Sequence, residues 1–411
     1  MTVARRTPIG ALVVAYLISS TGTALSAVAI PWLVLVSTGS AVATGVVGFA
    51  EMAPYVLLQA MAGPIVDRLG LRRAFLLGNL VAAVAVFLVF LLDARGILPF
   101  GVLVGLVAVA GAVRGAADAA TAPMIPPLAR MARWSDERAI GLYSGANRAA
   151  LLVGMPLAGV LVATMGAAGT VLLDSVSFLV AVVVVIVLVP SVGPGSEVVG
   201  SRLRPGAYVA ELREGFRFLR ADPLLLSLAA LIVVTNLLDQ AMSAVFLPVW
   251  AHGRVHDAVA FGLVGGASGL GMLAGVLLAA SVGPRLPRWI TFSLCTFIAA
   301  APPFFAVAGW ASVVPVMVVF FVCGVFGGVP NTIIGAVEYE RVPPVLQTRV
   351  LGAMRASAYL GVPFGSLLGG FLTQSIGLAL ACVTAGAVML VVTVAPLVFP
   401  VWRGLDRTVT A

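Results

Sequence analysis

Apolar stretches of about twenty residues or more recur along this 411-residue chain, and they constrain its fold more than any other feature. A helix needs about 20 residues to cross the hydrocarbon core of a bilayer. The chain is 61% hydrophobic and 10% charged, against about 45–50% and about 25% in soluble domains, so a soluble fold could not hide this apolar surface. The sequence therefore predicts an all-α polytopic membrane protein with twelve transmembrane helices. The expected spans are 10–37, 42–66, 74–93, 98–127, 139–165, 169–190, 223–250, 259–281, 290–308, 312–336, 350–376 and 378–400.

The arginines predict the orientation of these spans. All 24 basic residues are arginine, and the net charge is +8. If the N-terminus is cytoplasmic and the spans alternate, all but five arginines face the cytoplasm. Arg95 and Arg254 face outside, and Arg114, Arg148 and Arg355 fall within spans. This positive-inside bias indicates that both termini are cytoplasmic. The arginines are spread thinly between apolar runs, so we expect a bilayer and no nucleic acid as partner.

A polar connection near the midpoint divides the chain into two halves. We expect an N-terminal six-helix bundle over 1–190, a cytoplasmic linker over 191–222 and a C-terminal six-helix bundle over 223–411. The linker begins rich in Gly, Pro and Ser and ends in "YVAELREGFRFLRADP", whose apolar spacing predicts an amphipathic helix at the inner membrane surface.

The two halves also share a motif. "RAALLVGMP" and "RASAYLGVP" both read Arg-x5-Gly-x-Pro, and they are offset by 355 − 148 = 207 residues. Such an internal echo is typical of transporters built from two pseudo-symmetric halves. The glycines and prolines of this motif are expected to bend the helices or to serve ordinary close packing, and they are Gly154, Pro156, Gly361 and Pro363.

A charged turn between the second and third spans has a defined spacing. It reads Gly-x3-Asp-Arg-x-Gly-x-Arg-Arg, and its residues are Gly63, Asp67, Arg68, Gly70, Arg72 and Arg73. The glycines allow a tight turn. The carboxylate can accept hydrogen bonds at a neighbouring helix N-terminus, where anions are favoured. The arginines alone would indicate only a positive-inside loop.

Three carboxylic acids within predicted spans are candidates for proton coupling, namely Glu51, Asp118 and Asp239. Burial in an apolar site disfavours the charged form of a carboxyl group, so such a group can take up and release a proton near neutral pH. The alternatives are a structural acid bonded to a neighbouring Arg or Ser, and a site that recognises a cationic substrate.

Three arginines are also expected to be buried: Arg114, Arg148 and Arg355. Arg114 and Asp118 are four residues apart and can pair on one helix face. Glu51 or Glu338 are candidate partners for the other two arginines. The functional alternative to structural pairing is a proton relay or a site for an anionic substrate.

The charged turn resembles the loop signature of the major facilitator superfamily. Four further stretches resemble its drug:proton antiporter branch, which includes macrolide efflux proteins and the enterobactin exporter. They are "IPWLVLVSTGSAVATG", "LLDSVSFLVAVV", "ELREGFRFLRADPLL" and Gly154-x-Pro156-x2-Gly159. The resemblance implies two six-helix bundles around a central cavity, in a bacterial cytoplasmic (inner) membrane. It also implies that Asp67 and its arginines latch the cytoplasmic side against the span that starts near Arg349. The span-4 signature keeps Arg114 but has Asp118 where glycine is usual.

The function expected from these features is secondary export by proton antiport. The substrate would be a lipophilic or amphipathic small molecule such as a drug, an antibiotic or a siderophore. The proton gradient would supply the energy, with no cofactor, and the protein would function as a monomer. A proton-coupled importer or a lipid translocase of the same fold is the alternative. The chain shows neither a nucleophile–base pair nor a metal spacing at span depth, so we expect no enzyme, no catalytic residue and no metal. Polar and aromatic residues expected at the substrate cavity are Tyr55, Asn236, Gln240, Phe246 and Asn331.

Overall fold

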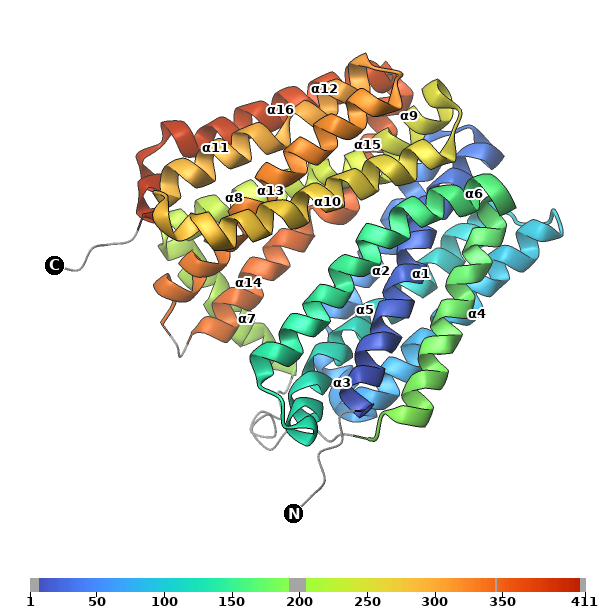
Figure 1. Ribbon diagram of the computed structural model, residues 1–411, viewed down its shortest axis with the longest axis horizontal. Helices are drawn as coiled ribbons and strands as arrows, with labels where there is room; N and C mark the ends of the chain where they lie inside the picture. The colour runs from blue at the N-terminus through green and yellow to red at the C-terminus, as the bar shows by residue number, and fades with distance from the viewer. Residues whose placement is uncertain (1–6, 192–204, 344–345, 407–411) are drawn as a thin grey trace. The chain divides into compact units, whose positions relative to one another are not determined.

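The computed structural model describes residues 7–191, 205–343 and 346–406, with the backbone alone at 63–65, 67, 205–212, 284, 339 and 348 (Figure 1). Within these ranges every regular element is a helix. Contacts divide the chain into two compact units, which we call the N-terminal unit (Met1–Thr38 and Val46–Leu203) and the C-terminal unit (Gly39–Gly45 and Arg204–Ala411).

The N-terminal unit is built from long helices that pack side by side. α1 packs along α6, and α4 packs against both α5 and α6. These helices and their neighbours are α1 (Thr7–Thr38), α2 (Ala41–Ala60), α3 (Ala62–Leu69), α4 (Leu71–Ala94), α5 (Phe100–Ala132) and α6 (Asp136–Leu188).

The helix α6 makes two crossings. It has 53 residues, and its helical geometry is broken at Gly166, where φ is 80°. Glycine suits this turn because residues with a side chain rarely adopt a positive φ. At 1.5 Å per residue an unbroken helix of this length would be about 80 Å long, more than twice the bilayer core. Figure 1 shows α6 folding back on itself, and the two arms correspond to the predicted spans 139–165 and 169–190.

The C-terminal unit is also built from helices, but more of them are divided into shorter helical elements. It comprises α7 (Pro205–Ala221), α8 (Pro223–Ala241), η1 (Met242–Phe246), α9 (Leu247–Trp250), η2 (Ala251–Val255), α10 (Ala258–Val282), η3 (Gly283–Arg285), α11 (Arg288–Ala300), α12 (Pro302–Gly309), α13 (Val313–Arg341), α14 (Gln347–Leu360), α15 (Val362–Ile376), α16 (Leu378–Val398) and η4 (Pro400–Leu405). Both η1 and η2 are π-helical turns, so one apolar segment runs from Pro223 to Val255.

The number of membrane crossings agrees with the prediction. In the described ranges 11 helical segments are long and apolar enough to span a membrane. Since α6 crosses twice, the total is 10 + 2 = 12. The all-α, twelve-span fold class is therefore confirmed, and the chain is an integral membrane protein.

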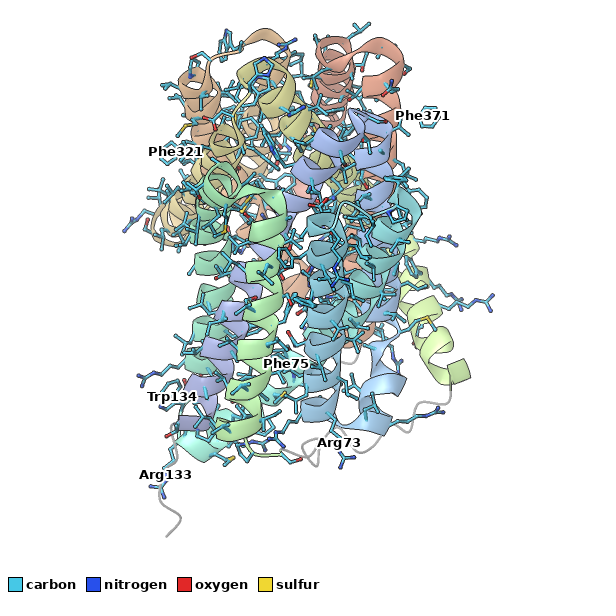
Figure 2. The ribbon with its side chains drawn as sticks, turned by 90° about the vertical axis from the view of Figure 1, so that its right-hand side faces the viewer. Arg73, Phe75, Arg133, Trp134, Phe321 and Phe371 are labelled. Carbon is cyan, nitrogen blue, oxygen red and sulfur yellow. The ribbon has the colours of Figure 1, made fainter. Side chains whose placement is uncertain are left out.

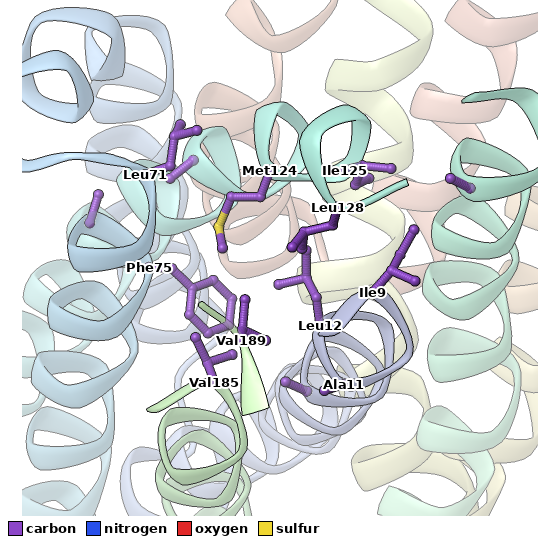
Figure 3. Close-up of a cluster of buried hydrophobic side chains, with 14 of the residues drawn as sticks. Ile9, Ala11, Leu12, Leu71, Phe75, Met124, Ile125, Leu128, Val185 and Val189 are labelled. Atoms are coloured by element: carbon purple, nitrogen blue, oxygen red, sulfur yellow. The ribbon is translucent and has the colours of Figure 1, made fainter. Parts of the chain in front are cut away.

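A buried apolar cluster closes one end of the N-terminal unit (Figure 3). Ile9 and Leu12 of α1 meet Phe75 of α4, Leu128 of α5 and Val185 of α6, and all five are at most 1% exposed. Arg73 and Arg133 lie at this same end of the unit in Figure 2. By contrast, large apolar side chains such as Phe321 and Phe371 point outward from the ribbon of the C-terminal unit, as side chains that face lipid do.

The amphipathic helix α7 is packed against its own unit. It contacts α14 and α8, and Arg349 Nη1 of α14 lies 2.6 Å from Glu214 Oε2 of α7. Gly215 allows the approach, because a Cβ there would collide with the backbone carbonyl of Arg349. The sequence indicated only a helix at the membrane surface, and the structure shows in addition that α7 packs against the start of α14. The Gly/Pro/Ser part of the linker lies outside the described residues.

Candidate functional site

Two glycines of α5 bring α2 unusually close. A Cβ at Gly111 would collide with the Glu51 carbonyl oxygen, and one at Gly115 would collide with the Tyr55 carbonyl oxygen. This Gly-x3-Gly face lets the two backbones touch, as small residues do in membrane helix pairs. The approach places the polar side chains of α2 directly opposite those of α5.

The first polar contact across this interface is an ion pair. Arg114 Nη1 lies 3.3 Å from Glu51 Oε1, and the two side chains are 14% and 20% exposed. Charge-assisted N–H···O bonds are usually about 2.7–2.9 Å long, so this pair is a loose one. The Arg114 guanidinium also lies over the Tyr55 ring, 5.8 Å from its centroid. The sequence indicated Asp118 as the partner of Arg114, and the structure pairs Arg114 with Glu51.

The second polar contact lies one helical turn further along. The Tyr55 hydroxyl donates to Asp118 Oδ2 across 3.1 Å, and Gln59 Nε2 donates to the Tyr55 hydroxyl across 3.2 Å. Asp118 therefore accepts a hydrogen bond from a neutral group of α2, whereas Glu51 is paired with the cationic Arg114. Tyr55, expected at a substrate cavity, is half-buried and belongs to this network.

A fourth ionisable residue, Asp174, joins the same region from α6, and sequence reasoning missed it. Its side chain is 1% exposed and accepts hydrogen bonds from the Ser26 hydroxyl of α1 and, at 3.4 Å, from the Ser177 hydroxyl. The sequence does contain a signal for Asp174, because it is the one acid in the apolar stretch "LLDSVSFLVAVV". An intramembrane acid is a functional candidate wherever it occurs.

Glu51, Arg114 and Asp174 line one pocket within the N-terminal unit. Its walls come from five helix segments and include Ser26 of α1, Glu51 of α2, Val86 and Val89 of α4, Arg114 of α5 and Asp174 of α6. The pocket has room for about one water molecule. Its size and its charges suit proton exchange, and it is too small for a drug-sized molecule.

The charged turn joins α3 to α4. Gly70 has φ 82°, which favours glycine, and it separates the two helices. Arg72 Nη2 donates to the carbonyl oxygens of Val185, at 3.3 Å, and Ile186, at 2.8 Å, so it caps the last turn of α6. Arg68 and Arg73 are exposed. The side chain of Asp67 lies outside the described part, as do the surroundings of Gly63, so the proposed latch stays a prediction.

In the C-terminal unit the predicted acid Asp239 is an exposed side chain near the end of α8, directly before the π-helical turn η1. π-Helical turns within helices are frequent at functional sites. The amide of Asn236 donates to the Ala358 carbonyl oxygen across 2.8 Å and so joins α8 to α14. Gln240 is half-buried and Asn331 is exposed.

The prediction that Phe246 lines the substrate cavity is wrong. Phe246 is fully buried, and its ring meets Phe304 edge-on with 6.3 Å between the centroids. The π-helical turn η1 directs this ring into the core of the C-terminal unit, which sequence spacing on a regular helix could not show.

Two of the three arginines expected to be buried are exposed: Arg148 and Arg355. Helical periodicity explains both positions. On α6 the buried residues around Arg148 are Ala146 and Ala150, so Arg148 lies on another face. On α14 Ala353 and Met354 are buried, while Arg355 points away. Only Arg114 of the three is mostly enclosed.

The repeated Gly-x-Pro motif behaves differently in the two units. The helix α6 continues through Gly154 and Pro156, and a Cβ at Gly154 would lie 2.6 Å from the Ala24 Cβ of α1. In the second copy the helix breaks, because α14 ends at Leu360 and α15 begins at Val362, with Pro363 in its first turn. A Cβ at Gly361 would lie 2.5 Å from the Val233 carbonyl oxygen of α8. Both glycines therefore allow close packing, and the second also marks a break.

The comparison with known proteins agrees with this architecture. The family model "Major Facilitator Superfamily" matches residues 12–250 and 229–410. The chain is 28% identical over 416 residues to the multidrug efflux pump Tap of Mycolicibacterium fortuitum, with 99% of each chain covered. It is 30% identical over 387 residues to the pump of the same name from Mycobacterium tuberculosis, with 91% of this chain and 88% of that pump covered.

Solved structures of low sequence identity share the fold. The nucleoside transporter NupG superposes with a TM-score of 0.76 at 10% identity, covering 95% of this chain and 98% of NupG. A POT family transporter in complex with 5-aminolevulinic acid superposes with a TM-score of 0.74 at 13% identity, covering 95% of each chain. Because the family model covers nearly the whole chain, this protein is a membrane transporter that belongs to the Major Facilitator Superfamily.

Proposed function

We propose that this protein is a proton-coupled exporter that moves lipophilic or amphipathic small molecules, such as a drug, an antibiotic or a siderophore, by alternating access. Export is supported by the similarity of this chain, over almost its whole length, to multidrug efflux pumps called Tap. Its family supports transport in general. The observation that carries proton coupling is the Glu51–Arg114 pair, a carboxylate and a guanidinium enclosed at span depth.

Glu51 is the proposed proton carrier of the N-terminal unit. When its carboxylate is ionised, Arg114 compensates the charge in a region from which bulk water is largely excluded. Protonation of Glu51 neutralises the carboxyl group and removes the attraction, so Arg114 turns to Asp118 or to another acceptor. A change in protonation thus changes which groups hold α2 and α5 together, and such a two-state contact can bias a transporter between its states.

Asp239 is the proposed second acid, with a different role. Its side chain is exposed on a helix that crosses the membrane, and charged groups at that depth face protein or water-filled space. It can bind a proton or the cationic group of an amphipathic substrate, and the neighbouring Gln240 and Asn236 add hydrogen-bonding groups. Competition between proton and substrate for one carboxylate is a simple physical basis for antiport.

The arginine distribution supports a cytoplasmic location of both termini, in a bacterial cytoplasmic membrane. The energy source in this proposal is the proton gradient, with no cofactor, and one chain is the functional unit. Asp67 and the arginines around it are proposed to latch the cytoplasmic side of the protein.

Transport into proteoliposomes of known sidedness tests the proposal. With an imposed pH gradient, a fluorescent lipophilic cation should move in the direction opposite to the protons. The variants Glu51→Gln and Asp239→Asn should each lose this gradient-driven movement, while Asp136→Asn, an exposed acid in the first turn of α6, should keep it.

Movement that ignores the gradient would contradict antiport. Movement in the same direction as the protons would instead indicate import, and movement of a labelled phospholipid alone would indicate a lipid translocase. Unchanged coupling in both acid variants would show that neither acid carries the proton.

A further inference from the structure

Asp174 is the most enclosed carboxyl group of the pocket, and the proposed function does not use it. It lies eight residues after the turn at Gly166, which is about 12 Å along the helix at 1.5 Å per residue. Among the described residues the hydrogen bonds that it accepts come from two hydroxyls, those of Ser26 and Ser177. Hydroxyls satisfy the oxygen atoms of a carboxyl group but do not compensate a full negative charge.

The charges around the pocket do not balance if every acid is ionised. Within the described part of the chain one guanidinium, that of Arg114, faces three carboxyl groups: Glu51, Asp174 and, one turn along α5, Asp118. A buried charge is retained only where it is paired, and an unpaired buried acid takes up a proton instead. Neutrality of this cluster therefore requires 3 − 1 = 2 bound protons. Since Glu51 holds the guanidinium, Asp118 and Asp174 are the groups that carry them.

The packing around Asp174 limits the charged groups that face it. On the α1 side a Cβ at Gly22 would lie 2.5 Å from Asp174 Oδ1, so α1 sits directly against the carboxyl group. α4 contributes the apolar Val86 and Val89 to the pocket, and α1 adds Ser26 and Ile30. Of the residues that the structure describes, the charged groups that face Asp174 are thus Arg114 from α5 and Glu51 from α2.

We propose that Asp174 is a second proton-binding residue of the N-terminal unit, neutral when Arg114 is paired with Glu51, and a competitor of Glu51 for Arg114 once it has lost its proton. The coupling to transport rests on the proposed function. In the exchange the O–H bond of Asp174 breaks and its proton passes to a water molecule, for which the pocket has room. Arg114 then turns to the new carboxylate, and Glu51, left without its cation, takes up that proton from the water. The net charge of the pocket is the same before and after.

Infrared difference spectroscopy on the purified full-length protein tests the proton on Asp174 without any transport assay. At neutral pH the wild type should show the carbonyl band of a protonated carboxylic acid, and Asp174→Asn should lose the part of this band that comes from one group. Asp136→Asn, an exposed acid on the same helix, should leave the band unchanged. Full retention of the band in Asp174→Asn would overturn the proposal.

A second variant keeps the test decisive if Asp174→Asn does not fold. Ser26→Ala removes one hydrogen-bond partner and leaves the carboxyl group in place, so it should shift the band to the higher frequency of a less strongly hydrogen-bonded carbonyl. An unshifted band would overturn the assignment.

The outcome separates this inference from the proposed function. If the band is lost in Asp174→Asn but the wild type shows no gradient-driven transport, the proton site stands and antiport fails. If transport is gradient-driven but the band does not respond to either variant, antiport stands and the role of Asp174 fails.

Discussion

The guanidinium of Arg114 on α5 pairs with Glu51 on α2, 3.3 Å from Nη1 to Oε1, although Asp118 lies one turn away on the same helix as Arg114. The pairing follows from backbone packing. Gly111 and Gly115 allow the α2 carbonyls to rest on α5, so the side chains of α2 lie within reach of those of α5. The site is therefore a product of helix–helix contact, and its stability and its function can be tested through that contact.

Removing only one partner of the pair should destabilise the protein more than removing both. Arg114→Gln leaves the Glu51 carboxylate enclosed without its cation, and breaking a buried pair in this way costs about 3–5 kcal/mol. We expect the lower end of this range, since the two side chains are 14% and 20% exposed. The double variant Glu51→Gln with Arg114→Gln should cost less. Unfolding in detergent, followed by intrinsic fluorescence, measures both. A double variant that loses the sum of the single losses would contradict a pairwise interaction.

Two glycine substitutions on α5 should change the stability of the protein in opposite directions. Gly115→Ala places a methyl group against backbone atoms of Tyr55 and Gln59, which cannot move cheaply, and overpacking of this kind costs about 1–3 kcal/mol. Gly105→Ala adds a methyl group where nothing lies within 4 Å, and it should stabilise the helix by about 0.5–1 kcal/mol. Thermal unfolding of the two variants side by side checks the prediction. Equal effects would show that α2 does not rest on α5 at Gly115.

Adjacent arginines of the charged turn should differ in their effect on stability. Arg72 donates to the carbonyl oxygens of Val185 and Ile186, and hydrogen bonds of a charged group contribute about 1.5–3 kcal/mol. Arg73 is exposed, so Arg73→Ala should leave the unfolding temperature nearly unchanged. Arg72→Ala should lower it and speed proteolysis at the end of α6. If both variants behaved alike, the capping role of Arg72 would be wrong.

Trp402 of η4 should act as an anchor for the end of the C-terminal unit. Its side chain is 3% exposed and stacks on Phe292 of α11, with 5.7 Å between ring centroids. Truncation of a buried tryptophan costs about 3–5 kcal/mol, so Trp402→Ala should lower the free energy of unfolding by that amount. Trp310→Ala is the matched control, because the Trp310 side chain is 46% exposed. A loss in Trp402→Ala no larger than in the control would show that η4 is not needed for folding.

Several elements could be predicted from the sequence because they depend on local composition. The apolar stretches predicted twelve crossings, and the structure has them, including the pair that meets at Gly166. The motif around Gly361 indicated either a bent helix or close packing, and α14 ends there. The same motif at Gly154 did not interrupt α6, because close packing against Ala24 is compatible with a continuous helix.

The site was predicted less completely. Glu51, Arg114, Asp118 and Tyr55 were all singled out, but the partner chosen for Arg114 was the nearest acid in sequence. Arg148 and Arg355 were expected to be buried because they lie within spans, and both are exposed because of the helix face they occupy. Asp174 was overlooked although it is the most buried of the acids in the pocket.

By itself, the sequence determined that this chain crosses a membrane twelve times, because the cost of placing polar and apolar residues in lipid adds up along each span. The charged turn likewise resembled the loop signature of the superfamily, and the repeated motif indicated a transporter built from two related halves. Only the tertiary structure decided that Glu51 pairs with Arg114, that Asp174 lines the same pocket, and that Tyr55 holds Asp118 one turn away. The reason is that contacts between helices depend on which faces carry glycine and at what rotation the helices meet, and neither quantity can be read from the order of residues in a single span.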